Sequence, residues 1–255
     1  MNELSLWRVE WLRLLRTKRL IALLGVFVLF GFAGPLLARY SGELLNHAGS
    51  SGQRVKIVFP PPVPADGVVQ YVSNALGIGL IVTVVVAAYA CSIDAGTALS
   101  VFYRTRARRF GDLLVPRFAV SAVGAVGGYL AGLLAAWYET AVLLGDPGTA
   151  AMGRTALAGS VYLVFAVAVT ALAATLARST LGTVGYALLV LFTLPLLGAV
   201  PHMSRWLPTE LTRAPDAFLR HTATDEAQRA LAVAVVLALG CLAAAILRGA
   251  RKEVR

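Results

Sequence analysis

Six long apolar runs limit what this chain can fold into. They cover residues 20–37, 68–91, 114–137, 156–177, 181–200 and 230–247. Each run approaches or exceeds the roughly 20 residues that an α-helix needs to cross the hydrocarbon core of a bilayer. The whole sequence is 58% hydrophobic and only 14% charged, whereas soluble domains are about 45 to 50% apolar. The sequence therefore predicts an all-α membrane protein, with one transmembrane domain of six helices over residues 1–255.

Residues 1–19 precede the first run and predict a helix that lies in the membrane interface. Its apolar side chains share one stripe on a helical wheel: Leu4, Trp7, Trp11, Leu14 and Leu15. Glu10, Arg13 and Arg16 lie on the opposite side of the wheel. Amphipathic helices with tryptophans and basic residues are typical of segments that lie among lipid head groups.

Basic residues are distributed unequally between the two ends of the predicted helices. Of the 23 Lys and Arg residues, fifteen fall at the end that carries both termini and the loop 92–113, and eight, balanced by eight acids, fall at the other. By the positive-inside rule, both termini and this loop are predicted to be cytosolic, in a multi-pass protein of the cell membrane. Residues 20–91 then hold spans one and two, and residues 114–255 hold spans three to six with a cytosolic tail.

The sequence lacks the motifs of several function classes. It has no H-E-x-x-H or G-x-S-x-G motif, and no G-x-x-x-x-G-K-[ST] loop that would bind nucleotide phosphates. The three histidines, His47, His202 and His221, lie in the outer loops without the spacing of a metal site. The basic residues flank apolar runs instead of forming one polar domain, which argues against nucleic acid as a partner. We therefore predict no catalytic, metal-binding or cofactor-binding residue in this chain.

The polar residues within the apolar runs are few, and those near the middle of a run are uncharged. No ionisable residue sits near the middle of a run, which disfavours ion-coupled transport. Five polar residues could line a path for an amphiphile: Tyr71, Asn74, Thr170, Tyr186 and Thr193. Hydrogen bonding between helices is the alternative role for them. Gly124, Gly128 and Gly132 recur at four-residue spacing, which predicts that another helix approaches the third one closely.

The loop 92–113 combines an apolar patch with a dense basic cluster. Asp94 suits a helix N-cap, so residues 95–103 predict a short helix on the cytosolic side. The apolar patch is too short to cross a bilayer and consists of Leu99, Val101 and Phe102 with their neighbours. Four arginines follow within residues 104–109. The loop has two interpretations: a basic segment that only fixes topology, or a surface that a partner protein contacts.

The whole layout resembles the permease subunit of the type 2 ATP-binding cassette (ABC) transporters. In that family, the loop after the second span begins with an acid, a variable residue and then Gly-Thr, continues through an apolar turn and reaches a basic residue. Asp94-Ala95-Gly96-Thr97 and Arg109 match that order, with Asp where Glu is usual and without the Pro that is common near Thr105.

The resemblance implies that the loop is a coupling helix that docks on a separate ATPase. The residues expected at this contact are Asp94, Gly96, Thr97, Leu99, Val101, Phe102, Arg104 and Arg106. It also implies two copies of the ATPase, which would bind ATP and Mg, a second permease subunit of the same or a different sequence, and membrane lipids around them. The chain itself would be a non-catalytic part of an exporter for a drug-like, lipid-like or glycan substrate.

Two other function classes stay open. A membrane-integral enzyme acting on lipids would turn over substrate when purified alone. A non-transporting sensor or scaffold would bind partners without nucleotide-dependent transport.

Overall fold

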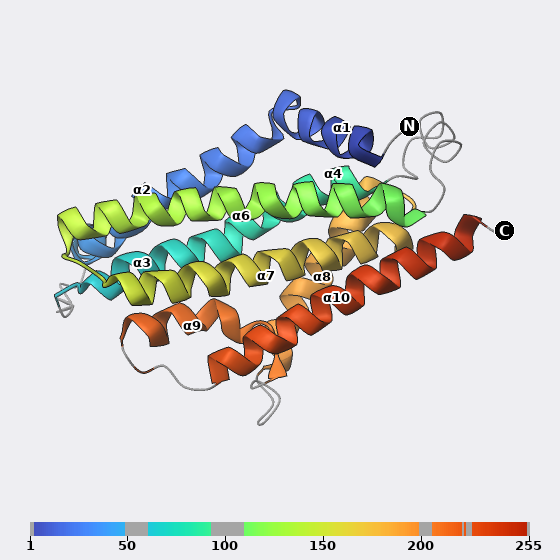
Figure 1. Ribbon diagram of the computed structural model, residues 1–255. Coiled ribbons are helices and arrows are strands. Elements are labelled where there is room, and N and C mark those ends of the chain that lie inside the picture. The colour runs from blue at the N-terminus through green and yellow to red at the C-terminus, as the bar shows by residue number, and fades with distance from the viewer. Residues whose placement is uncertain are drawn as a thin grey trace.

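The computed structural model describes residues 3–48, 61–92, 110–198, 206–220, 222 and 226–253. These residues form helices and short connections, without a strand among them (Figure 1). The helices in chain order are α1 (Glu3–Arg16), α2 (Arg19–Ala48), α3 (Pro64–Asn74), a π-helical turn (Ala75–Gly79), α4 (Leu80–Cys91), α6 (Phe110–Leu143), α7 (Thr149–Leu176), α8 (Thr180–Leu197), α9 (Glu210–Leu219) and α10 (Glu226–Glu253). The all-α membrane fold expected from the sequence is therefore confirmed.

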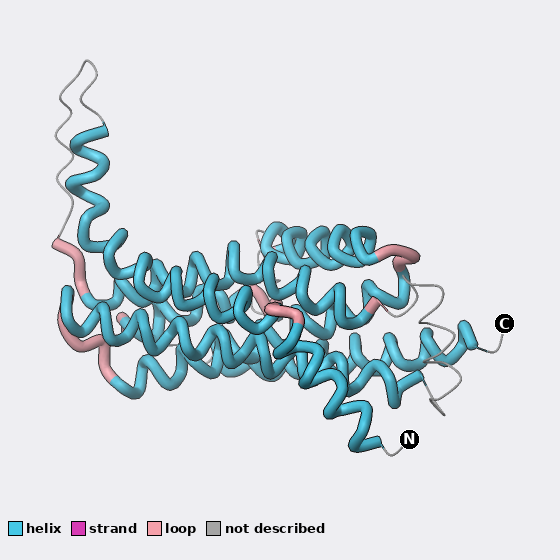
Figure 2. Tube along the Cα trace, turned by 90° about the horizontal axis from the view of Figure 1, so that it is seen from above, coloured by secondary structure: helices cyan, strands magenta, loops and turns pink. Residues whose placement is uncertain are grey.

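Six helical segments are long and apolar enough to cross a membrane: α2, the continuous α3–α4 segment with its π turn, α6, α7, α8 and α10. They run alongside one another, and α1 lies at the same end of the bundle as the C-terminal end of α10 (Figures 1 and 2). The helices extend past the apolar runs because backbone hydrogen bonding continues into the polar residues at their ends. Since α6 begins at Phe110, residues 110–113 are helical, although the sequence placed them in the loop.

α2 and α6 approach each other closely through glycines on both helices. A Cβ added at Gly132 of α6 would collide with the carbonyl oxygen of Phe27, and one added at Gly31 of α2 would collide with the backbone of Gly132. At Gly128 an added Cβ would lie 2.9 Å from the Phe27 ring. The close approach predicted from the glycine spacing is confirmed, and the structure identifies the partner as the first span.

Two buried tyrosines join the second, third and fourth spans at the centre of the bundle. Tyr71 donates its hydroxyl hydrogen to the backbone oxygen of Tyr129 at 2.6 Å, and the two rings stack with their centroids 5.8 Å apart. Tyr129 in turn donates to the backbone oxygen of Thr155 at 3.1 Å. Because buried hydroxyls are costly without a partner, these bonds fix the relative positions of α3, α6 and α7.

α2, α8 and α10 are the least enclosed spans. In their apolar windows 28%, 17% and 22% of the residues are buried, whereas the windows of the other three spans are 50 to 67% buried. Their remaining apolar side chains are therefore left for lipid or another chain to cover.

Candidate functional site

The expected ATPase contact lies outside the described residues. All eight members fall between residues 93 and 109: Asp94, Gly96, Thr97, Leu99, Val101, Phe102, Arg104 and Arg106. The structure does describe the two helix ends from which this loop leaves. These are Ser92, directly after α4, and Phe110, the first residue of α6.

Arg117 holds the end of α4 to two other helices. From α6, its Nε donates to a carboxylate oxygen of Glu10 in α1 at 3.0 Å, and its Nη1 donates to the backbone oxygen of Ala90 at 3.3 Å. Ala90 belongs to the last turn of α4, where carbonyl oxygens have no donor within the helix and carry partial negative charge. Arg117 and Glu10 are only 4% and 8% exposed. The pair therefore joins α1, α4 and α6 at the base of the loop.

The same base is fastened by a second polar contact and by apolar packing. The hydroxyl of Ser92 lies 3.1 Å from that of Thr183, in the first turn of α8. Phe110 is buried, and its ring lies against the backbone of Gly249 in α10. An apolar cluster that includes Cys91 and Phe110 also contains residues of α1, α7 and α10. Both ends of the loop are thus set in one packed region that joins several helices.

A cavity of about 580 Å³ lies where α3 and α4 meet α7, α8 and α9. Its size falls within the roughly 300 to 1,000 Å³ of small-molecule sites. The apolar side chains in its lining include Val72, Leu76, Leu80, Tyr162, Leu191 and Phe192. The polar side chains in its lining are Ser73, Thr212, Arg213 and Asp216. An apolar wall with a few polar groups suits an amphiphilic molecule.

The π-helical turn of the second span forms part of the cavity wall. Leu76 and Gly77 lie within this turn and line the cavity. The hydroxyl of Thr83 donates to the backbone oxygen of Gly79 at 2.9 Å and so satisfies a carbonyl at the end of the turn. An added Cβ at Gly79 would lie 2.7 Å from the Phe27 ring, so the turn also packs closely on α2. Such π turns occur frequently at functional sites because they interrupt regular helical geometry.

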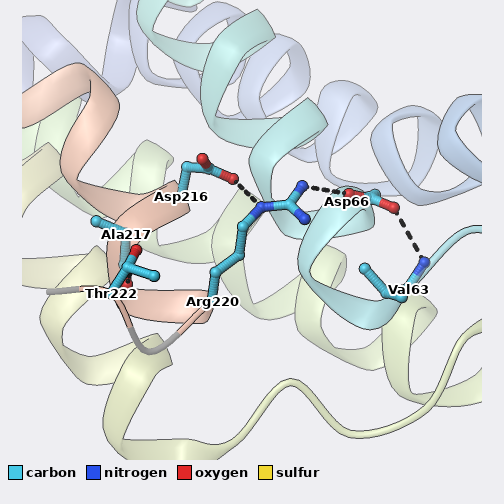
Figure 3. Close-up of polar contacts among 6 residues, drawn as sticks. All are labelled: Val63, Asp66, Asp216, Ala217, Arg220 and Thr222. Atoms are coloured by element: carbon cyan, nitrogen blue, oxygen red, sulfur yellow. Dashed lines mark hydrogen bonds and ion pairs between the residues drawn. The ribbon is translucent and has the colours of Figure 1, made fainter.

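Arg220 connects the α9 wall of the cavity to the start of α3 (Figure 3). Its Nε donates to Asp216 at 2.6 Å and its Nη2 donates to Asp66 at 2.8 Å, while Asp66 also accepts the backbone N–H of Val63 at 3.0 Å. The hydrogen bond from Arg220 to Asp216, together with the charges of both carboxylates, raises the pKa of Arg220 above its ordinary value. The side chains of Asp66, Arg220 and Asp216 are 34%, 48% and 51% exposed to solvent. Exposed ion pairs contribute little and are screened by salt, so α9 is held mainly by the burial of Leu211 and Leu219 in the apolar core.

The structure does not bring the five expected path residues together. Tyr71 and Thr170 are buried in the core, and the Thr170 hydroxyl donates to the backbone oxygen of Ala166 at 2.8 Å. Tyr186 and Thr193 lie on exposed parts of α8, and Asn74 is half-buried beside the π turn. None of these five is among the residues that line the cavity.

Sequence reasoning missed the Glu10–Arg117 pair and the cavity for different reasons. By sequence, Arg117 is only one of the charges that set topology, and the helical wheel puts Glu10 on the polar face of its helix. Two signals were available: an acid among basic residues in the middle of the first helix, and an arginine just inside the edge of an apolar run. The cavity residues Leu76 and Leu191 carry no signal, because they look like any other apolar residue of a span.

Comparisons with known proteins support only the membrane assignment. No family model matches this chain, and no solved structure matches it. The chain is 24% identical over 225 residues to a Bacillus subtilis (strain 168) protein described as the uncharacterized transmembrane protein YxlG, and the match covers 86% of this chain and 85% of that protein. That description agrees with a membrane-spanning helical protein and names no activity.

Proposed function

We propose that this chain is the permease subunit of an ATP-driven ABC exporter, energised by a separate ATPase that docks on the loop after the second span. The proposal rests on the structure of that second span. Its inner end anchors the loop through the Ala90–Arg117 and Ser92–Thr183 contacts, and its π turn, near the middle of the span, lines the cavity. One helix thus connects the proposed docking surface with the proposed substrate site.

The ATPase binds ATP and Mg, and its two copies move together when ATP binds. In the loop, Leu99, Val101 and Phe102 form the apolar centre of the contact, and Arg104 and Arg106 form its rim. The base of the loop transmits the displacement to the second and third spans, because Arg117 joins them. The cavity behind α9 then admits or releases an amphiphile, of drug-like, lipid-like or glycan type.

A second permease subunit completes the assembly. The spans α2, α8 and α10 leave most of their apolar windows uncovered within one chain. A second copy, or a related chain, covers part of that surface, and membrane lipids cover the rest.

The docking surface is tested by the substitution Phe102→Asp. A buried apolar anchor in a small interface contributes on the order of 2 kcal/mol or more, which is roughly a 30-fold change in affinity. We expect the variant to insert normally but to lose the ATPase on purification from native membranes, and to lose stimulated ATP hydrolysis in vesicles. Arg108→Ala is the matched control and should retain both, because Arg108 lies outside the proposed contact and neighbouring arginines share its effect on topology. Full retention by Phe102→Asp would leave the loop with its topological role alone.

The orientation is tested by labelling single cysteines in a chain whose Cys91 and Cys241 are replaced by alanine. Ser100→Cys is expected to react only from the cytosol, and Thr149→Cys only from outside. Thr149 is preferred to its neighbour Gly145 because it is exposed at the start of α7, whereas Gly145 has a φ of 108° that a cysteine would strain. Reaction of both sites with an impermeant maleimide on intact cells would contradict cytosolic termini.

A further inference from the structure

The outward face of α1 interleaves large apolar side chains with cations. Trp7 and Trp11 are each 38% exposed. Val9, Leu12 and Leu15 are exposed as well. The exposed cations of α1 and the turn that follows it are Arg8, Arg16 and Lys18. This face is neither a buried packing surface nor an ordinary hydrated one.

The acid of this helix is turned away from that face. Among the α1 side chains that the structure describes, Glu10 is the one carboxylate, and it is buried against Arg117 at 3.0 Å with Arg13 at 3.8 Å. Its negative charge is therefore balanced inside the protein. The outward face keeps the positive charges of Arg8, Arg16 and Lys18, and no carboxylate lies on it among the α1 side chains that the structure describes.

The position of α1 places this face at the edge of the membrane. α1 lies obliquely against the inner end of α6, and the first span begins at Arg19, three residues after α1 ends (Figures 1 and 2). The guanidinium carbon of Arg19 lies 5.6 Å from the centre of the Tyr89 ring, near the inner end of α4. Tryptophan, tyrosine and arginine at this level are characteristic of the head-group layer.

We propose that α1 and its junction with α2 bind the anionic phospholipid head groups of the inner leaflet. The cations attract the phosphates, and the tryptophans and leucines enter the adjoining acyl region. A soluble polyanion fits less well, because it would leave five large apolar side chains in water, whereas a lipid covers both kinds of group. Each cation near an anionic bilayer strengthens binding about fivefold. This inference does not depend on the transport proposal.

The test uses the full chain with Trp137 and Trp206 replaced by phenylalanine, so that Trp7 and Trp11 report alone. The protein is reconstituted into phosphatidylcholine vesicles that contain equal fractions of either brominated phosphatidylglycerol or brominated phosphatidylcholine. Bromine quenches tryptophan fluorescence on contact, so the ratio of the two quenching constants measures preference for the anionic lipid. We expect phosphatidylglycerol to be favoured about fivefold or more.

Two charge-matched variants locate the preference. Arg8→Gln with Arg16→Gln and Lys18→Gln should bring the ratio close to one, whereas Arg39→Gln with Arg154→Gln and Arg229→Gln should leave it unchanged. Both sets remove three exposed charges. Equal quenching by the two lipids in the chain with α1 intact would overturn the proposal, even if a triple variant failed to fold. Quenching by neither lipid would also overturn the proposal, since the face would then be covered by something other than lipid. An equal loss of preference in both triple variants would overturn it as well.

Discussion

Arg117→Ala is expected to lower the free energy of unfolding by about 3 kcal/mol, because the buried Glu10 carboxylate loses its hydrogen-bonded cation and keeps the longer 3.8 Å contact with Arg13. It also removes the donor that satisfies the Ala90 carbonyl oxygen at the end of α4. The measurement is reversible unfolding in mixed detergent micelles. Arg178→Ala is the matched control, since Arg178 is also basic and predicted cytosolic but is exposed, and its effect should stay within about 0.5 kcal/mol.

A double variant separates the cost of an unpaired charge from the value of the pair itself. Arg117→Met with Glu10→Met should recover most of the lost stability, because a buried ion pair can often be replaced by apolar side chains at little cost. Recovered stability without recovered stimulation of the ATPase would indicate that the pair is needed to hold the base of the loop in position. If Arg117→Ala were no more destabilising than Arg178→Ala, the pair would not be buried in the way described.

Gly132→Ala is expected to destabilise the bundle by about 3 kcal/mol, near the upper end of the usual range for overpacked cores. The added methyl group would meet the carbonyl oxygen of Phe27, which is backbone and cannot swing aside, and the hydroxyl of Tyr71. The effect is measured as the loss of folded protein on gel filtration in mild detergent and as a lower midpoint of thermal unfolding.

Gly127→Ala provides the control on the same helix. Nothing lies within 4 Å of a Cβ added at Gly127, so this change should be neutral or stabilise by up to about 1 kcal/mol through helix propensity. Equal behaviour of the two variants would mean that α2 and α6 can separate slightly without loss, and that their close approach is not required for folding.

The spans were predictable because hydrophobicity over about 20 residues responds directly to the bilayer. The glycine spacing predicted a close helix crossing, but only the structure identifies α2 as the partner, because spacing on one helix does not specify the other. Helical-wheel reasoning placed Glu10 on the polar face, since it takes no account of a cation on a distant helix. Tyr71 and Thr193 were grouped by polarity alone, whereas one is enclosed by the core and the other bonds to its own helix.

The π turn at Ala75–Gly79 has a rotational consequence for the second span. A π turn closes its hydrogen bond one residue later than an α turn, and each residue of an α-helix represents about 100° of rotation. Removal of one residue here would therefore rotate the outer half against the inner half by about that angle, whereas a shift of the turn along the helix would rotate only the residues that the turn passes. Val69 and Val72 would then turn away from the cavity while Leu80 kept its direction. The cavity wall can thus be rearranged by a twist about the helix axis, without any helix tilting or separating from its neighbours.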